Sequence, residues 1–205
     1  MATYLPPIER PRGLILRLLY FFMRRQFGKV ATPIAVFSAR MPLGFLTFYG
    51  KLPRLDKKLA LPPPTAALIR ERVASLNTCL FCMDATRWYT MKRSPDEIAR
   101  FDALAEYRTS PLFSEAERAA LDYATELTAS KAVDPATFAR LSRHYSDREI
   151  CGIVWLVASE HLYNLTNIGL NIGSDGLCEL GQPRTATAPN SSPRSTGETE
   201  SATAR

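Results

Sequence analysis

The chain has 205 residues, and 46 % of them are apolar, which is enough to build the core of one domain with extensions. Its four cysteines are too few for a disulfide-stabilised scaffold, and the absence of a recognisable nucleic-acid-binding motif argues against a nucleic-acid partner. The net charge of +6 is unevenly distributed. Residues 1–60 hold eleven Lys and Arg against two Asp and Glu, whereas residues 61–205 hold fifteen against eighteen.

Residues 1–60 form a basic, aromatic-rich N-terminal extension, which we predict to contain two or three helices interrupted by Pro33, Pro42 and Pro53. The first residues, MATYLPPIERPRG, lack the layout of a signal peptide. A chain without that layout, and without the cysteine pairs of a secreted scaffold, is expected in the reducing cytoplasm.

The apolar run from Leu14 to Met23 contains Arg17 and is followed by Arg24 and Arg25. It is too short to cross a bilayer, which takes ~20 apolar residues, so we expect no transmembrane segment. The run is compatible with a helix lying on a membrane surface, or with a helix packed on the core or on a neighbouring subunit. The second interpretation is favoured because no clean basic face lies opposite an apolar one.

Helix-start signals recur along residues 61–182, where a capping residue or a proline precedes an amphipathic stretch. They begin at Pro62, Ser94, Ser114, Asp134 and Ser146. The last of them opens the longest predicted helix, which runs to about Leu170. No stretch alternates apolar and polar residues long enough to indicate a strand, so the fold class is all-α. Residues 183–205 have almost no large apolar side chain and are predicted to be a disordered tail.

The stretch NTCLFCMDATRWY holds a Cys-x-x-Cys pair, Cys79 and Cys82. If a helix begins near Cys79, the two thiols lie one turn apart on one face, at a spacing that permits a disulfide. A thiol in a first helical turn is also close to free backbone N–H groups, which favour the reactive thiolate. Asn77 and Thr78 are possible caps of this helix.

Two other roles compete with redox chemistry for this pair. A structural zinc site needs four ligands, and the remaining candidates show no paired spacing. These candidates are His144, Cys151, His161 and Cys178. Two inert cysteines in a core are the plainer alternative, because free cysteine is often buried. We expect neither a metal ion nor a cofactor.

Three segments carry a resemblance to a known family: RERVASLNTCLFCMDA, EYRTSPLFSEAERAALDYATELT and REICGIVWLVASEHLYNLTNIGLNIGSDGLCEL. Together they span about Thr65 to Leu180 and resemble the carboxymuconolactone decarboxylase and alkylhydroperoxidase D superfamily. The resemblance implies an alkylhydroperoxidase D-like helical bundle over residues 61–182. It also implies a homo-oligomer, a trimer or larger, and often a thiol-dependent peroxidase activity of the peroxiredoxin type.

The resemblance also assigns roles to the cysteines. Cys82 corresponds to the thiol that attacks a hydroperoxide, and Cys79 to the one that resolves the sulfenic acid into a disulfide. Peroxidatic members carry a Glu twelve residues before the first cysteine and a His four residues after the second. Ala67 and Thr86 occupy these positions here. Thr86 can hydrogen-bond a thiolate, but it cannot accept the thiol proton at neutral pH.

Substitutes for the missing proton relay are Glu71, one turn beyond the expected position, and His161, whose imidazole titrates near ~6.5 when unperturbed. In the last long helix, Glu160 and Asn164 begin a polar stripe that continues to Asn167. We predict that Glu160 and Asn164 form a pocket wall. The alternatives are a hydrogen-bonding face between subunits and ordinary exposure to solvent.

Two charged residues next to the cysteine pair complete the candidate site. Asp84 is close in sequence, and its negative charge should raise a cysteine pKa. Arg87 could offset this effect if it turned back toward the thiols.

Three functions are compatible with these residues. The first is a thiol-dependent oxidoreductase that reduces a small hydroperoxide and is recycled by an external thiol, of a lipoyl or thioredoxin-like type. The second is a decarboxylase-like lyase acting on a small carboxylated lactone, with His161 and Arg87 as proton carrier and anchor. The third is a non-catalytic oligomer that kept the scaffold and lost the relay.

Overall fold

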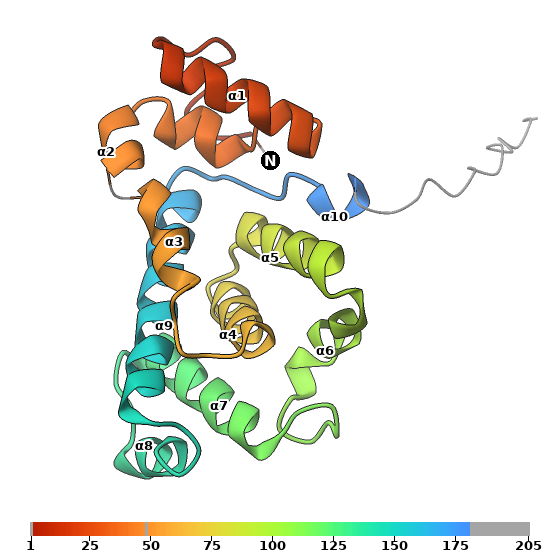
Figure 1. The fold of residues 1–205 in the computed structure, drawn as a ribbon, viewed down its shortest axis with the longest axis vertical. Coiled ribbons are helices and arrows are strands. Elements are labelled where there is room, and N and C mark those ends of the chain that lie inside the picture. The colour runs from red at the N-terminus through yellow and green to blue at the C-terminus, as the bar shows by residue number, and fades with distance from the viewer. Residues whose placement is uncertain (1, 48, 181–205) are drawn as a thin grey trace, which may run out of the picture.

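The computed structural model describes residues 2–47 and 49–180. The predicted tail, residues 183–205, lies outside the described residues. The described part is all-helical and contains no strand, as the sequence predicted (Figure 1). The α-helices are α1 (Leu14–Phe27), α2 (Pro42–Thr47), α3 (Leu52–Asp56), α4 (Pro63–Leu76), α5 (Leu80–Arg93), α6 (Ile98–Asp102), α7 (Glu115–Ser130), α8 (Pro135–Leu141), α9 (Asp147–Ile168) and α10 (Leu177–Leu180). A π-helix spans Ile34–Ser38, and 3-10 turns span Tyr49–Lys51, Pro95–Glu97 and Leu104–Glu106.

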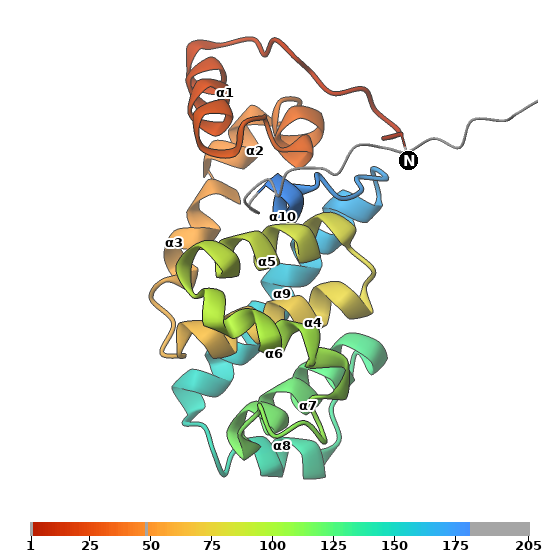
Figure 2. The ribbon, with the colours of Figure 1, turned by 90° about the vertical axis from the view of Figure 1, so that its right-hand side faces the viewer.

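Helix α4 is the centre of the bundle and packs against α5, α7 and α9 (Figure 2). Its apolar residues Ile69 and Val73 are completely buried against Ala120 of α7 and Ile153 of α9. The small alanine side chains of α7 allow α4 and α7 to pack closely. Each fully buried large apolar side chain contributes roughly 1.5–3 kcal/mol, so this cluster fixes where α5 and α9 lie.

The predicted helix starts at Ser114 and Ser146 are confirmed as capping boxes, and the cap at Asp134 is confirmed as well. Ser94 does not cap a helix as the sequence predicted, although Ser94 and Glu97 have the spacing of a capping box. Ser94 follows the last residue of α5, and its N–H donates to the Thr90 carbonyl at 2.8 Å. The same N–H is therefore not free to donate to the Glu97 carboxylate, as a capping box requires. A 3-10 turn forms there instead.

Helices α1 and α2 of the N-terminal extension lie at one end of the molecule, above α5, whereas α3 runs beside α9 (Figures 1 and 2). The chain that follows α9 runs between the extension and α5. Lys29 of the extension forms an ion pair with Asp175 of this segment at 2.9 Å, and the backbone N–H of Thr32 donates to the same carboxylate. The Tyr49 hydroxyl lies 2.5 Å from the hydroxyl of Thr166 on α9.

The three predicted prolines mark changes of element in the extension, as expected. Pro33 precedes the π-helix, Pro42 begins α2, and Pro53 lies in the first turn of α3. No helix in residues 2–47 and 49–180 combines the length and the apolar character needed to cross a membrane. The division of the chain near residue 60 stays a prediction.

Candidate functional site

The cysteine pair lies at the junction between α4 and α5. Cys79 is the N-cap residue of α5, Cys82 lies in its first turn, and the two form a disulfide with Cα atoms 5.3 Å apart. Only 1 % of Cys79 and 6 % of Cys82 is exposed. The sequence therefore placed the helix start and the pairing of these thiols correctly.

The predicted caps of α5 are absent, because no side chain accepts a bond from its first N–H groups. Thr78 has a left-handed backbone, with φ of 56°, and its hydroxyl donates to the Asn77 carbonyl. The Asn77 side chain turns toward α9, where its Nδ2 donates to Asn164 Oδ1 at 2.8 Å. The first N–H groups of α5 therefore have no side-chain cap, and an uncapped helix start favours a thiolate in its first turn, where Cys82 lies.

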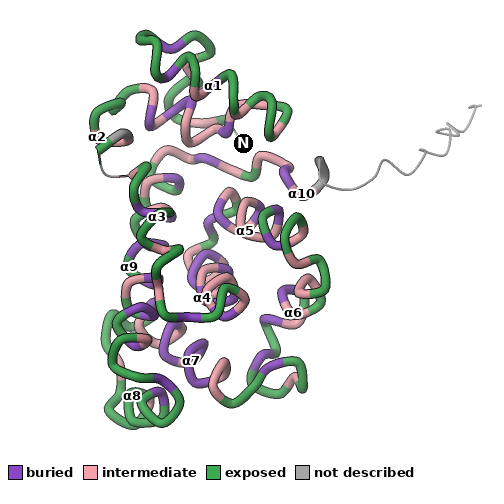
Figure 3. Tube along the Cα trace, viewed as in Figure 1, coloured by how far each residue is buried: buried purple, intermediate pink, exposed green. Residues whose placement is uncertain are grey.

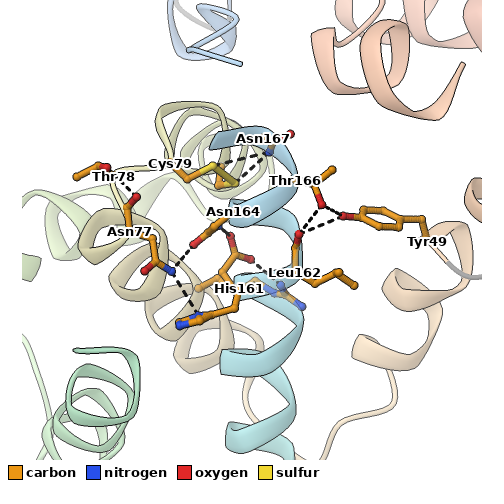
Figure 4. The surroundings of a disulfide bond; sticks show 12 residues. Tyr49, Asn77, Thr78, Cys79, His161, Leu162, Asn164, Thr166 and Asn167 are labelled. Carbon is orange, nitrogen blue, oxygen red and sulfur yellow. Dashed lines mark hydrogen bonds and ion pairs between the residues drawn. A yellow bond between two sulfur atoms is a disulfide. The ribbon is translucent and has the colours of Figure 1, made fainter. Parts of the chain in front are cut away.

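Asn167 of α9 contacts both sulfur atoms (Figure 4). Its Nδ2 lies 3.3 Å from Cys82 Sγ and 3.7 Å from Cys79 Sγ, and the side chain is buried. An amide donor stabilises a thiolate and lowers its pKa, but it cannot remove the thiol proton. The sequence contained a signal for this residue, namely its place in the polar stripe, without indicating that it would reach the sulfurs.

A cavity of about 530 Å³ opens beside Cys82, between the N-terminal extension and helices α5 and α9. Cys82 and Thr86 line it. Most of the wall is apolar and aromatic, with rings from Phe27, Phe37, Phe45, Tyr49, Phe81 and Tyr163. The thiolate hydrogen bond assigned to Thr86 stays a prediction, since the bond to sulfur seen in this disulfide form comes from Asn167.

One charged cluster lies in the cavity wall. Arg70 bonds Asp56 at 2.6 Å and Glu160 at 2.8 Å, and Glu160 is 3 % exposed. Burial raises the pKa of Glu160, although Arg70 and a hydrogen bond from Asn164 oppose this effect. Within the described lining, Arg70 is the one cation, and two carboxylates already pair with it. The cavity is therefore suited to a neutral molecule.

Asn164 lies behind Glu160 rather than in the described cavity wall. Its Nδ2 donates to Glu160 Oε1 at 2.7 Å, and its Oδ1 accepts from Asn77 (Figure 4). Asn77 Nδ2 also lies 3.3 Å from Nδ1 of His161, whose Nε2 lies 2.9 Å from Lys131 Nζ. This amide chain positions Glu160, which lies in the cavity wall.

Neither predicted member of the proton relay is among the residues that line the cavity. Burial and the nearby Lys131 lower the pKa of His161, so the imidazole is neutral at pH 7. Burial raises the pKa of Glu71 to about 8, with Arg87 opposing the effect, and Glu71 Oε2 is buried without a hydrogen-bond partner. A relay through these two residues stays a prediction.

Asp84 and Arg87 point elsewhere than the sequence suggested. Asp84 accepts bonds from Ser174 and from the backbone N–H groups of Leu177 and Cys178. Burial and the bond with Asp84 raise the pKa of Cys178 to about 11, so the carboxylate acts on this thiol. Arg87 forms an ion pair with Asp102 at 2.5 Å.

The zinc alternative receives no support from side-chain positions. Within residues 2–47 and 49–180, no three His, Cys, Asp or Glu side chains converge on a point where a metal ion could bind.

The sequence is 33 % identical over 186 residues to YnjA of Escherichia coli K12, an uncharacterised protein, covering 88 % of this chain and 98 % of YnjA. No family model matches the chain. Its fold is shared with the debrominase Bmp8, at a TM-score of 0.73 and 22 % identity over 88 % of this chain and 96 % of Bmp8. That structure is a cysteine-to-alanine variant in complex with 2,3,4-tribromopyrrole.

A second solved structure is an uncharacterised peroxidase-related protein with an alkylhydroperoxidase AhpD core, from Ralstonia eutropha JMP134. It matches at a TM-score of 0.68 and 20 % identity, over 87 % of this chain and 99 % of that protein. This chain belongs to the same family as YnjA, and it has the alkylhydroperoxidase D-like fold of these solved structures. The matches to Bmp8 and YnjA cover more of the chain than residues 61–180, so this alkylhydroperoxidase D-like fold includes part of the extension that lines the cavity.

Proposed function

We propose that this protein is a thiol-dependent oxidoreductase whose Cys82 attacks a small, neutral, apolar substrate inside the cavity, with Cys79 as the resolving thiol. The observation that carries the proposal is the position of Cys82. It lies in the first turn of α5, receives a hydrogen bond from Asn167, and is the cysteine that lines the aromatic cavity.

With a hydroperoxide as substrate, the Cys82 thiolate attacks the outer oxygen and the O–O bond breaks. The leaving alkoxide takes a proton from water and departs as an alcohol, and Cys82 becomes a sulfenic acid. The Cys79 thiolate then attacks the Cys82 sulfur, and hydroxide leaves and is protonated to water. The product is the Cys79–Cys82 disulfide seen here. An external thiol, of a lipoyl or thioredoxin-like type, returns two electrons and restores both thiols.

Neutrality of the substrate separates this proposal from the lyase alternative. A carboxylated lactone needs a free cation as anchor, whereas Arg70 is paired twice and Arg87 is paired with Asp102. The hydroperoxide reductase is therefore the better supported of the two. A homo-oligomer in a reducing cytoplasm remains part of the proposal.

Similarity to the debrominase Bmp8 over nearly its whole length supports a second candidate, reductive debromination of a small aromatic ring. Here the Cys82 thiolate takes bromine from carbon as a sulfenyl bromide, and the ring carbon takes a proton. Cys79 attacks the sulfenyl bromide, releases bromide, and forms the same disulfide. Both candidates use the same two thiols, so bromide release and hydroperoxide loss can be compared on one preparation.

The test is turnover of cumene hydroperoxide, a neutral aromatic hydroperoxide, with dithiothreitol as reductant. We expect Cys82→Ser to abolish turnover. After reduction and removal of dithiothreitol, Cys79→Ser should complete one round with the hydroperoxide and accumulate a sulfenic acid at Cys82. Cys151→Ser is the matched control, because Cys151 is an exposed free thiol outside the pair. Equal turnover in the Cys82→Ser variant and the native protein would overturn the proposal. Inactivity of the native protein toward both the hydroperoxide and a bromopyrrole would favour the non-catalytic scaffold.

A further inference from the structure

Helix α1 is apolar on two opposite faces. Its inner face is buried through Leu16 and Tyr20. Figure 3 shows that much of α1 is exposed. On the outer face, five large apolar side chains are 53 to 81 % exposed: Leu14, Ile15, Leu18, Phe21 and Phe22. Their spacing of i, i+1, i+4, i+7 and i+8 places them on one stripe. We call this stripe the outer face of α1. An exposed contiguous apolar stripe of this kind marks a surface that another body covers.

The surroundings of the outer face are strongly basic. Arg17, Arg24 and Arg25 project from α1 and are exposed, and Arg10 and Arg12 precede the helix. Glu9 is the one acidic residue in residues 1–55. The body that covers the outer face must therefore offer an apolar layer together with negative charge. An anionic lipid surface offers both, because acyl chains accept the apolar side chains while headgroups meet the arginines.

The same helix reaches the catalytic cavity. Met23 and Phe27, on the inner side of α1, line the cavity that Cys82 opens into. Phe27 also packs on Trp88 of α5, with ring centroids 4.7 Å apart. One helix thus separates the cavity from the surface on which the outer face would rest.

We propose that the outer face of α1 docks on an anionic lipid surface, and that the Cys82 cavity takes an apolar hydroperoxide dissolved in that lipid. The second half of this statement rests on the proposed function, whereas the first half does not. A cytoplasmic protein meets such a surface at the inner leaflet, which carries anionic lipids.

A second copy docked through its own outer face fits less well than lipid does. A two-fold contact between two outer faces would bring Arg17 and Arg24 of one protomer toward the same residues of its partner, and like charges repel. Helix α9 carries another exposed apolar row, which includes Val154, Leu162 and Leu165, on a segment without arginines. That row provides a matched control surface for the test.

The experiment is sedimentation of the full chain with vesicles of phosphatidylcholine alone or mixed with phosphatidylglycerol. We expect binding to the anionic vesicles, weakened by salt because the charges are exposed. The double variant Leu18→Asp/Phe22→Asp should lose binding by at least about tenfold. Arg17→Gln and Arg24→Gln should each weaken it about fivefold. Leu165→Asp on α9 should bind as the native chain does.

Three results separate the outcomes. No sedimentation with anionic vesicles at low salt overturns the docking proposal, and so does equal sedimentation of the Leu18→Asp/Phe22→Asp variant. A drop in the solution mass of that variant by light scattering, without vesicle binding by the native chain, would show that a second copy covers the outer face.

Cys82→Ser must bind vesicles normally, so that loss of the redox proposal leaves this one testable. Turnover of a lipid hydroperoxide in anionic vesicles should fall in the double variant, while turnover of cumene hydroperoxide in solution should not.

Discussion

Asn167 of α9 donates a hydrogen bond to the Cys82 sulfur. We expect Asn167→Ala to raise the pKa of the Cys82 thiol, because it removes a donor 3.3 Å from that sulfur. A hydrogen bond to a charged group contributes about 1.5–3 kcal/mol, which corresponds to a rise of about 1–2 pKa units. Turnover at pH 7 should fall about tenfold to a hundredfold as the thiolate becomes scarce.

The control for this prediction is Asn171→Ala, because Asn171 donates to the Ala2 carbonyl near the surface instead of to sulfur. Rates of alkylation at Cys82 across pH provide the measurement. An unchanged Cys82 profile in Asn167→Ala would show that the helix terminus alone activates the thiol.

Glu71 should make the stability of the folded protein depend on pH. Burial raises its pKa from 4.5 to about 8, so between these pH values the native protein keeps a proton that the unfolded chain releases. Stability therefore falls as pH rises through this window. Glu71→Gln has no such proton to lose. From about pH 5 to pH 8, the free energy of unfolding of Glu71→Gln should rise relative to that of the native protein by on the order of 1–4 kcal/mol. Above pH 8 the difference between the two proteins should stay constant.

Urea unfolding of both proteins at a series of pH values checks this, with the exposed Glu106→Gln as control. A constant difference between Glu71→Gln and the native protein across pH would contradict the raised pKa. The sequence could nominate Glu71 as a titrating group. It could not show that Glu71 lies apart from the cavity, since that depends on how α4 is rotated against α5 and α9.

Helix α5 is anchored by Asp84, which accepts bonds from the segment that precedes α10. Burial would raise the pKa of Asp84, but hydrogen bonds from Leu177, Cys178 and Ser174 outweigh it and lower the pKa. A depressed pKa contributes stability above the unfolded value of 3.8, and that stability is lost as pH falls through the native value. We expect Asp84→Asn to be less stable at pH 7 by about 1–3 kcal/mol.

The difference between Asp84→Asn and the native protein should shrink below about pH 4, where the unfolded chain takes up the proton, and should disappear below the lowered native pKa. Thermal unfolding at pH 7 and pH 3 checks this, and Asp96→Asn is the control because Asp96 is exposed. Equal losses at both pH values would show that the carboxylate charge is unimportant for this anchor.

The helix starts show which local sequence patterns predict an N-cap correctly. The boxes at Ser114 and Ser146 were predictable because donor and acceptor lie within three residues of each other. Ser94 carries the same pattern and fails, because the preceding helix uses its N–H. Asn77 fails as a cap for a similar reason, since its side chain bonds α9. Local patterns therefore predicted helix starts well wherever no neighbouring element competed for the same group.

The cavity was beyond sequence reasoning because its wall combines residues from Met23 to Leu177. The sequence identified the cysteine pair, Glu160 and a basic extension as separate features. Packing of the extension over α5 and α9 brings them together, and no local spacing encodes that packing. The paired state of Arg70, which supports the proposal of a neutral substrate, likewise depends on contacts with Asp56 and Glu160.

At the scale of the whole molecule, two kinds of feature have opposite effects on the pKa of Cys82. Burial raises a cysteine pKa, whereas the uncapped start of α5 and the Asn167 amide lower it. The most direct measurement is the pH dependence of alkylation at Cys82 and Cys79 in the reduced native protein, resolved by peptide mass. An apparent pKa for Cys82 well below ~8.5, with slower reaction at Cys79, is the expected result. If both thiols titrate at or above ~8.5, or stay unreactive until the chain unfolds, Cys82 is not an activated nucleophile and the proposed chemistry is wrong.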